Sequence, residues 1–307
     1  MNLLLTGCFN YTTEQLDAIS SLGYRIFYME SEKYDNLPLP AELVDATVCN
    51  YLFTTNDFDI FKNIKLIQLT SVGLDRVPVD KIKAKGCRLF NAKGVYSTPM
   101  AEWALFRVLE KYKQGWFFKS EQEKKCWTKN RGIKEIFGTK VAIIGAGNIG
   151  REVARIFNSF GANIEGYDIH TNCFPDFDNM FLIDTLKQNI DRYDVVILTV
   201  PLLPSTKGLM SKDILKSLKN EAIIVNISRG AIIDEQALIE VLSDRQDIFA
   251  ALDVFEQEPL SENSPLWTMS NVAISPHNSF VSNGNNSRMY NVIYTNLREF
   301  ISEVGIQ

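Results

Sequence analysis

A glycine-rich hexapeptide, GAGNIG at residues 145–150, constrains the fold of this chain more than any other feature. It follows directly on the apolar run VAII and opens a stretch with helical spacing of its apolar residues. The residues that share one face of that stretch are Ile149, Val153, Ile156, Phe157 and Phe160. A strand, a glycine turn and a helix in this order are typical of a dinucleotide-binding βαβ unit. A purely structural glycine turn is the alternative.

Each glycine of the hexapeptide has a separate expected role. Gly145 permits the tight turn, Gly147 permits close approach of a pyrophosphate, and Gly150 permits close packing of helix on sheet. The backbone amides of Asn148 and Ile149, at the start of the helix, are expected to face the phosphates.

Asp168 lies 18 residues after Gly150, at the end of the next apolar run. A carboxylate at this point accepts hydrogen bonds from the ribose hydroxyls of an adenosine. The residues that follow it, Ile169, His170 and Thr171, include no arginine to receive a 2′-phosphate. The sequence therefore favours NAD over NADP.

Short apolar runs in two series predict two α/β domains. The first series is NLLLTG, YRIFYM, ATVCNY, IKLIQLT and CRLFNA, and the second is KVAIIG, ANIEGYD, DVVILTV, EAIIVNIS, IFAALDV and NVAISPH. Helix-like stretches separate the runs, which is typical of parallel sheets. A long helix is predicted between the series, from Thr98 to Phe118, as a domain linker, a dimer surface or both.

Composition narrows the functional classes. With 307 residues, of which 46% are hydrophobic and 22% charged, the chain can bury two cores. The net charge of -5 argues against a nucleic-acid-binding protein, and no apolar run reaches the roughly 18 residues of a membrane helix. Five scattered cysteines without a CxxC pair predict reduced thiols, no metal site and a cytoplasmic location. The first residues, MNLLLTGCF, predict a strand, because a signal peptide would carry a basic segment.

Three further residues follow the hexapeptide at or near the ends of predicted strands. They are Arg229, Glu258, which precedes a proline, and His277, one of two histidines. A cation, a carboxylate and an imidazole are the groups needed to assist the transfer of a hydride and a proton. A satisfied loop histidine is the alternative for His277, and a solvated acidic loop, with Glu256 and Glu262 nearby, is the alternative for Glu258.

Seven blocks in a fixed order carry a family resemblance. They are SVGLDRV, NAKGVYSTPMAEWAL, GAGNIG, PLLPSTKGL, VNISRGAIID, ALDVFEQEPL and SPHNSF. With these blocks the chain resembles the D-isomer-specific 2-hydroxyacid dehydrogenase family, in the phosphoglycerate dehydrogenase-like short form. Only 30 residues follow His277, so the regulatory domain of longer relatives is expected to be missing.

The resemblance implies a fold and an assembly. A doubly wound Rossmann coenzyme domain, residues 98–275, is expected to be inserted into a smaller flavodoxin-like α/β substrate domain, residues 1–97 and 276–307. It also implies an active site in the cleft between the domains, and a homodimer.

The resemblance further implies residue roles. Additional cofactor-binding residues would be Val200, Pro201, Thr206, Ile227, Ser228 and Asp253, the last through the nicotinamide carboxamide. A helix cap is the alternative for Asp253, since a charge at a strand end is costly to bury without a partner. The amides of Val72 and Gly73 would receive the substrate carboxylate, although SVGLD fits an ordinary tight turn equally well.

Tyr51, Phe53 and Phe280 match the family's pocket for the substrate side chain. Because these side chains are apolar or aromatic, an unphosphorylated 2-keto acid is expected to fit better than a phosphorylated one. Lys93, close to the same loop, leaves a phosphorylated substrate open.

The implied activity is the NAD-dependent interconversion of a D-2-hydroxy acid and its 2-keto acid. His277 would carry the proton, Glu258 would orient the imidazole, and Arg229 would hold the substrate carboxylate and polarise the carbonyl. Two alternatives stay open: an NAD-sensing, corepressor-like binding protein of the same fold, and a dehydrogenase of a non-hydroxyacid substrate such as formate or phosphite. The implied small-molecule partner is the 2-keto or 2-hydroxy acid itself.

Overall fold

The chain divides into two compact units in a computed structural model that describes residues 1–305. Unit 1 comprises residues 1–95 together with the chain from residue 282 onward, and unit 2 comprises Tyr96–Val281. The domain boundaries expected from the sequence lie at 97/98 and 275/276, whereas the units meet at 95/96 and 281/282. The difference assigns His277 to the unit that carries the glycine turn.

Unit 2 is built on seven parallel strands. They are β6 (Lys140–Ile144), β7 (Asn163–Asp168), β8 (Asn179–Leu182), β9 (Val195–Leu198), β10 (Ile223–Asn226), β11 (Phe249–Leu252) and β12 (Val272–Ile274). Their order, β12-β11-β10-β9-β6-β7-β8, reverses direction beside β6, as in a doubly wound Rossmann sheet. The predicted fold class is confirmed. The sequence missed β8, a short edge strand in which no residue is fully buried.

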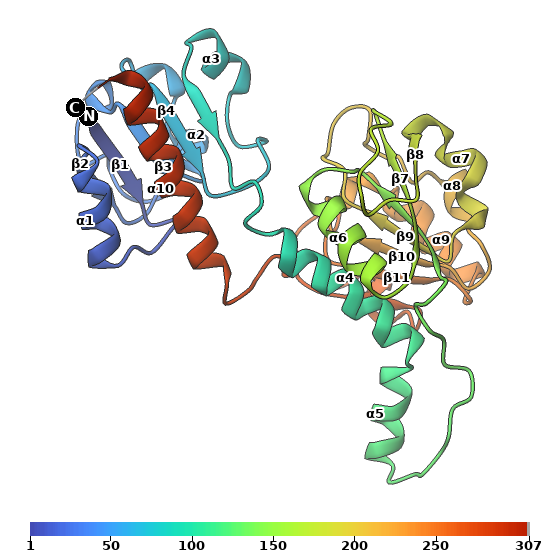
Figure 1. Ribbon diagram of the computed structural model, residues 1–307. Helices are drawn as coiled ribbons and strands as arrows, with labels where there is room; N and C mark the ends of the chain where they lie inside the picture. The colour runs from blue at the N-terminus through green and yellow to red at the C-terminus, as the bar shows by residue number, and fades with distance from the viewer. Residues whose placement is uncertain (306–307) are drawn as a thin grey trace. The chain divides into compact units, whose positions relative to one another are not determined.

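Both faces of this sheet are covered by helices (Figure 1). The helices are α4 (Ser97–Tyr112) and α6 (Asn148–Ser159) on one face, and α7 (Leu186–Asn189), α8 (Lys212–Lys216) and α9 (Glu235–Asp244) on the other. Within β6, Val141 and Ile143 join the core under α4 and α6, while Ala142 and Ile144 join the opposite core. Alternate residues of a strand point to opposite faces, so a strand buried on both faces is a continuous apolar run.

The prediction of one long helix from Thr98 to Phe118 is wrong in one respect, because the structure has two helices there. Helix α4 ends at Tyr112, Gln114 adopts a left-handed conformation with φ of 56°, and a second helix, α5 (Gly115–Glu123), begins after it. A residue in the left-handed conformation just after the last turn is a common way to end a helix. Helix α5 then projects from the rest of unit 2 (Figure 1).

Unit 1 contains a five-stranded parallel sheet in the order β2-β1-β3-β4-β5, which is the flavodoxin-like order. Its strands are β1 (Asn2–Thr6), β2 (Arg25–Met29), β3 (Ala46–Cys49), β4 (Leu66–Leu69) and β5 (Arg88–Phe90). Its helices are α1 (Thr13–Ser21), α2 (Leu52–Thr55), α3 (Val79–Ala84) and α10 (Asn285–Val304). Short 3₁₀ turns in the two units are Ala41–Leu43, Phe58–Ile60, Ile183–Thr185, Ile190–Arg192, Gly230–Ile232 and Pro265–Thr268.

Helix α10, from the end of the chain, packs into the N-terminal sheet. The Tyr24 hydroxyl donates to the Leu297 carbonyl at 3.0 Å, and the Asn296 amide donates to the buried Gln68 side chain at 2.6 Å. These contacts explain why the two ends of the chain form one unit. Among the residues described, no helix combines the length and apolar character required to cross a bilayer.

Phe157 and Phe160 of the α6 region allow a matched stability test. Both were expected on one face of the helix, but Phe157 is fully buried and Phe160 is 45% exposed at the helix end. We expect Phe157→Ala to lower the free energy of unfolding by about 3–5 kcal/mol, because it leaves a cavity between helix and sheet. Phe160→Ala should cost less than about 1 kcal/mol. Equal losses in denaturant unfolding would contradict the assignment.

Candidate active site

The residues expected to bind cofactor and to carry the chemistry in unit 2 all lie at the carboxyl ends of its strands. The strands and residues are β6 with 145–150, β7 with Asp168, β9 with Val200, Pro201 and Thr206, β10 with 227–229, β11 with Asp253 and Glu258, and β12 with His277 and Phe280. In open parallel sheets this edge is where ligands bind.

The glycine turn has the geometry expected of it. Gly145 has φ of 103°, which favours glycine, and its amide donates to the Tyr167 carbonyl at 2.7 Å. A Cβ on Gly150 would lie 1.9 Å from the Gly145 carbonyl oxygen, so only glycine lets the helix start so close to the strand. A Cβ on Gly147 would meet no protein atom within 4 Å. The space beside Gly147 therefore fits a phosphate group at a helix N-terminus.

Asp168 reaches back to the glycine turn. Its carboxylate accepts from the Ala146 amide at 2.6 Å and from the Ile169 amide at 2.7 Å. Thr199, which the sequence reasoning did not select, donates its hydroxyl to the Gly145 carbonyl at 2.7 Å. The ends of three neighbouring strands, β7, β6 and β9, are thus joined by polar contacts around the turn.

Thr206 shapes the loop that follows β9. Its buried hydroxyl donates to the Pro201 carbonyl at 2.6 Å and accepts from the Leu203 amide at 2.8 Å. Both contacts lie within the loop, so the geometry gives Thr206 a part in holding the Pro201 segment in place.

The loop that carries Arg229 is held by hydrogen bonds to the side chain of Asn226. Asn226 is a second residue that sequence reasoning missed. The buried Asn226 side chain accepts from the amide and hydroxyl of Ser228, at 3.1 and 2.9 Å, and donates to the Arg229 carbonyl at 3.0 Å. The half-buried Arg229 guanidinium donates to the Ser228 carbonyl at 2.8 Å. An asparagine at the end of the apolar run IIVN was the available signal, because a buried amide needs partners.

Gly230 brings the Arg229 loop against the Glu258 loop. A Cβ on Gly230 would lie 1.8 Å from the backbone carbon of Phe255 and 2.3 Å from the amide nitrogen of Glu256. No side chain fits at this position. The glycine after Arg229 therefore lets two loops, from adjacent strands β10 and β11, approach at backbone distance.

His277 and Glu258 form a pair. Their Nδ1 and Oε2 atoms are 2.8 Å apart, and each side chain is 38% exposed. The other Glu258 oxygen accepts from the Phe255 amide at 3.1 Å, which fixes the carboxylate. Since Nδ1 faces Glu258, the Nε2 atom is the ring nitrogen left to exchange a proton with a ligand. The Phe280 ring lies edge-on to the imidazole, with centroids 5.9 Å apart.

Asp253 holds the loop that carries His277. Its fully buried carboxylate accepts from the Ser275 hydroxyl, from the Asn278 amide at 2.8 Å and from the Ser279 amide at 2.9 Å. The His277 amide donates to the Asp253 carbonyl at 2.7 Å, and His277 has φ of 50°. Asp253 is therefore a positioning residue for His277, whereas its contact with a nicotinamide stays a prediction.

Except for Phe280, which follows β12 in unit 2, the expected substrate-binding residues lie at the carboxyl edge of the other sheet, in unit 1. Tyr51 and Phe53 follow β3, and Val72 and Gly73 follow β4. The Asn91 side chain donates to the Val72 carbonyl at 2.8 Å, and the Ser71 hydroxyl donates to the Gly73 carbonyl at 3.0 Å. These two contacts hold the turn in place, and the binding of an anion by its amides stays a prediction.

Two cysteines near these loops are not set up as nucleophiles. Burial raises the pKa of the Cys8 thiol to about 11, and the nearby Glu32 carboxylate adds to the rise. Burial likewise raises the pKa of Cys49 well above its ordinary value. Both thiols are protonated at neutral pH, and a protonated thiol is a poor nucleophile. The described part of the chain contains no group of three histidine, cysteine or acidic residues placed to hold a metal.

Comparison with known proteins identifies the family. Residues 105–279 match the family described as D-isomer specific 2-hydroxyacid dehydrogenase, NAD binding domain. The chain belongs to this family. It is 34% identical to the hydroxypyruvate reductase of Thermotoga maritima over 227 residues, which cover 73% of each chain.

Two other similarities extend the comparison. The chain is 34% identical to the D-3-phosphoglycerate dehydrogenase of Methanocaldococcus jannaschii over 219 residues, 70% of this chain but 41% of that protein. A crystal structure of a D-isomer specific 2-hydroxyacid dehydrogenase family protein from Aeromonas salmonicida subsp. salmonicida superimposes with a TM-score of 0.81 at 24% identity, covering 98% and 96% of the two chains. The family members share the fold, and the match to the longer dehydrogenase is partial.

Gly147 and Gly150, at the start of α6, offer a test of the cofactor site. Gly150→Ala should lower the melting temperature, because its methyl group collides with the Gly145 carbonyl. Gly147→Ala should leave the melting temperature unchanged, because the new methyl group meets no protein atom. It should nevertheless weaken NADH binding about tenfold or more, or ~1.4 kcal/mol, by obstructing the pyrophosphate. Unchanged NADH affinity in Gly147→Ala, by fluorescence titration, would count against this site.

Proposed function

We propose that the protein is an NAD-dependent D-2-hydroxyacid dehydrogenase that interconverts a D-2-hydroxy acid and its 2-keto acid. The observation that carries the proposal is the His277–Glu258 pair, at 2.8 Å and with both side chains accessible. A carboxylate on one ring nitrogen fixes the tautomer and stabilises the imidazolium, so that the other nitrogen can act on a substrate.

In ketone reduction, His277 as imidazolium donates the Nε2 proton to the carbonyl oxygen as that oxygen gains negative charge. Bound NADH would supply the hydride that reaches the carbonyl carbon. In the reverse direction neutral His277 accepts the hydroxyl proton at Nε2. Glu258 remains a carboxylate throughout and stabilises the charged ring, as the third group does in a triad.

Arg229 and the Val72–Gly73 turn are proposed to hold the substrate. A guanidinium presents a planar fork of donors that matches a carboxylate, and it also polarises a neighbouring carbonyl oxygen. The backbone amides of Val72 and Gly73 supply further donors to the carboxylate. Tyr51, Phe53 and Phe280 are proposed to surround the rest of the substrate.

For the cofactor we propose NAD, bound at the carboxyl edge of the seven-stranded sheet. The open space at Gly147 supports a pyrophosphate there, and Asp168 supports a ribose with free hydroxyls. The remaining residues proposed to line this site are Gly145, Asn148, Ile149, Gly150, Val200, Pro201, Thr206, Ile227, Ser228 and Asp253.

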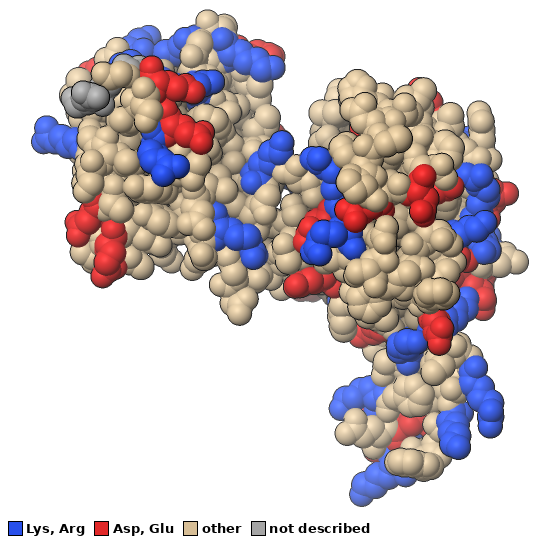
Figure 2. Space-filling view, in the orientation of Figure 1, with Lys and Arg blue, Asp and Glu red and all other residues tan. Residues whose placement is uncertain are grey.

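A homodimer is also part of the proposal. Helix α5 and the segment after it expose Trp116 and Phe118 to 43% and 41%, and Trp127 to 99%. Figure 2 shows lysine and arginine side chains gathered over the same projecting segment. Large exposed aromatic groups on a projecting arm are typical of protein contacts, and a second copy is the partner proposed to cover them.

Asp168 gives a test of cofactor choice. Asp168→Ala should lower kcat/KM with NADH more than with NADPH, because the carboxylate accepts from a 2′-hydroxyl and repels a 2′-phosphate. We expect the NADH to NADPH ratio to fall about tenfold or more, equivalent to ~1.4 kcal/mol. Asp168→Asn keeps an acceptor for the Ala146 amide and isolates the effect of charge. Asp178→Asn is the control, because the Asp178 carboxylate also accepts from a backbone amide, that of Ile164. It should leave the NADH to NADPH ratio unchanged.

The proton-transfer step is tested at His277. His277→Ala should lower kcat about 10²- to 10⁴-fold, the usual contribution of a positioned acid-base group, with little change in NADH affinity. Glu258→Gln should produce a smaller loss, since the imidazole remains but the charge that stabilises imidazolium is gone. His170→Ala, at the other histidine of the chain, should not change kcat.

Substantial reduction of every 2-keto acid by the His277 variant would show that another group moves the proton. Failure of the unaltered protein to reduce any 2-keto acid with NADH or NADPH, although it binds NADH, would instead support a cofactor-sensing protein of this fold.

A further inference from the structure

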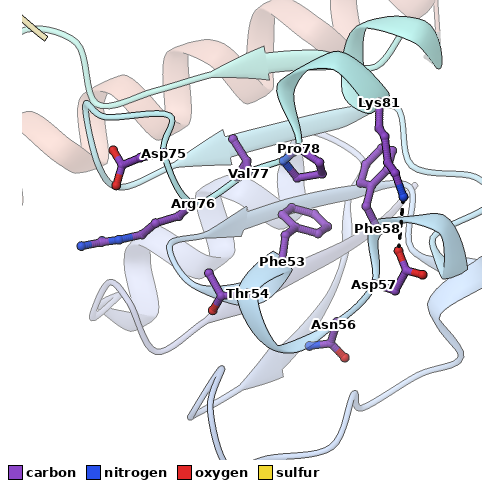
Figure 3. Close-up of a pocket in the computed structure, with 10 residues that line it drawn as sticks. All are labelled: Phe53, Thr54, Asn56, Asp57, Phe58, Asp75, Arg76, Val77, Pro78 and Lys81. Atoms are coloured by element: carbon purple, nitrogen blue, oxygen red, sulfur yellow. Dashed lines mark ion pairs between the residues drawn. The ribbon is translucent and has the colours of Figure 1, made fainter. Parts of the chain in front are cut away.

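A cavity of about 320 Å³ lies in unit 1 beside the proposed substrate residue Phe53. The residues that line it are Phe53, Thr54, Asn56, Asp57, Phe58, Asp75, Arg76, Val77, Pro78 and Lys81. Two cations, Arg76 and Lys81, lie at opposite ends of it, with Phe53, Val77 and Pro78 between them (Figure 3). Their electrostatic surroundings differ.

Lys81 is neutralised within the protein. Its ammonium group lies 2.6 Å from an oxygen of Asp59 and 3.8 Å from an oxygen of Asp57, and the hydrogen bond with Asp59 raises the pKa of Lys81. Both carboxylates belong to the segment beside the cavity. Lys81 therefore has its counter-charges in place without a ligand.

Arg76 is held differently, by neutral groups. Its Nη1 donates to the Asn50 side-chain oxygen at 3.0 Å, and its guanidinium carbon lies 4.0 Å from the centroid of the Tyr51 ring. Among the ion pairs of residues 1–305 none includes Arg76, although its neighbour Asp75 also lines the cavity. A stacked guanidinium keeps its edge donors free, because the ring contacts its face. Arg76 is thus a fixed cation with donors left for an anion.

The support for Arg76 is itself rigid. Glu32, a buried carboxylate, accepts from the Asn50 amide at 2.8 Å, from the Tyr51 amide, and from the Thr6 hydroxyl at 2.6 Å. Glu32 therefore fixes the backbone of the two residues that hold Arg76. A side chain whose orientation is set before binding loses less conformational entropy on binding.

Arg76 also lies close in sequence to the residues proposed to bind the substrate carboxylate. It belongs to the loop after β4 that contains Val72 and Gly73, and its partner Tyr51 follows β3, the strand paired with β4. The turn proposed to receive the substrate carboxylate, the Arg76 cation and the loop that supports it thus share one edge of one sheet.

We propose that Arg76 is a specificity-determining residue that binds a second anionic group, a carboxylate or a phosphate, on the side chain of the 2-keto acid. The inference rests on the proposed dehydrogenase function and names its substrate class. It changes the expectation of an apolar side-chain pocket, because one face of the Tyr51 ring is occupied by a guanidinium. An anion at this point would meet a planar fork of charged donors.

The test compares substrates of one reaction. We expect the unaltered protein to reduce 3-phosphohydroxypyruvate or 2-ketoglutarate, each with a second anion, with a higher kcat/KM than hydroxypyruvate, phenylpyruvate or 2-ketoisocaproate. The first two compounds distinguish a phosphate from a carboxylate. Arg76→Gln should lower the ratio of kcat/KM for the preferred dianion to that for hydroxypyruvate at least tenfold, mainly through KM. Arg76→Lys, which keeps the charge but not the fork, should fall between.

Lys81→Gln is the matched control, since it removes a cation of the same cavity that already has carboxylate partners. It should leave the substrate ratio as it is, and melting temperatures of all variants establish that they fold. If 2-keto acids are reduced but Arg76→Gln does not change the ratio, or monoanions are preferred, the role of Arg76 is overturned and the dehydrogenase proposal stands. If no 2-keto acid is reduced with either cofactor, the dehydrogenase proposal fails and the role of Arg76 fails with it.

Discussion

The buried carboxylate of Asp253 is the contact on which the candidate active site depends most. It sits at the end of β11, has no exposed surface, and accepts three hydrogen bonds from the segment 275–279 that follows β12. A buried charge is tolerated only when its acceptor sites are used, so the segment must keep this course. The left-handed backbone of His277 is held in the middle of that segment, and the direction of the imidazole follows from it.

A second constraint is the close approach at Gly230. Because the backbone after Arg229 lies against that of Phe255 and Glu256, the loops of β10 and β11 cannot move independently. Glu258 is anchored by the Phe255 amide, next to this contact, and pairs with His277. The guanidinium, the carboxylate and the imidazole thus come from three consecutive strands whose loops are joined by backbone contacts. Because the loops are joined in this way, the order of the strands in the sheet determines how the three groups are arranged.

Sequence patterns predicted the parts of this organisation that depend on residues close together in the chain. The glycine turn is readable because strand, turn and helix are contiguous, and the buried strands because they are continuous apolar runs. The edge strand β8 lacks such a run, and the helix break at Gln114 depends on one left-handed residue. Thr199 and Asn226 were not selected as site residues for other reasons. Thr199 donates to the Gly145 carbonyl in the loop of a neighbouring strand, and sequence spacing does not encode that distance. Asn226 bonds to Ser228 and Arg229 within its own loop, and the pattern showed only an amide at the end of an apolar run.

The same distinction between local and distant contacts applies to substrate recognition. Read along the chain, Tyr51 and Phe53 are aromatic residues and indicate an apolar pocket. In the folded unit the loop after β4 returns beside the loop after β3 and places Arg76 over the Tyr51 ring, 4.0 Å from its centroid. A cation on an aromatic face is compatible with both an apolar surrounding and an anionic ligand. The chemistry of this edge of the sheet is therefore set by a pair of residues 25 positions apart, and neither residue alone predicts it.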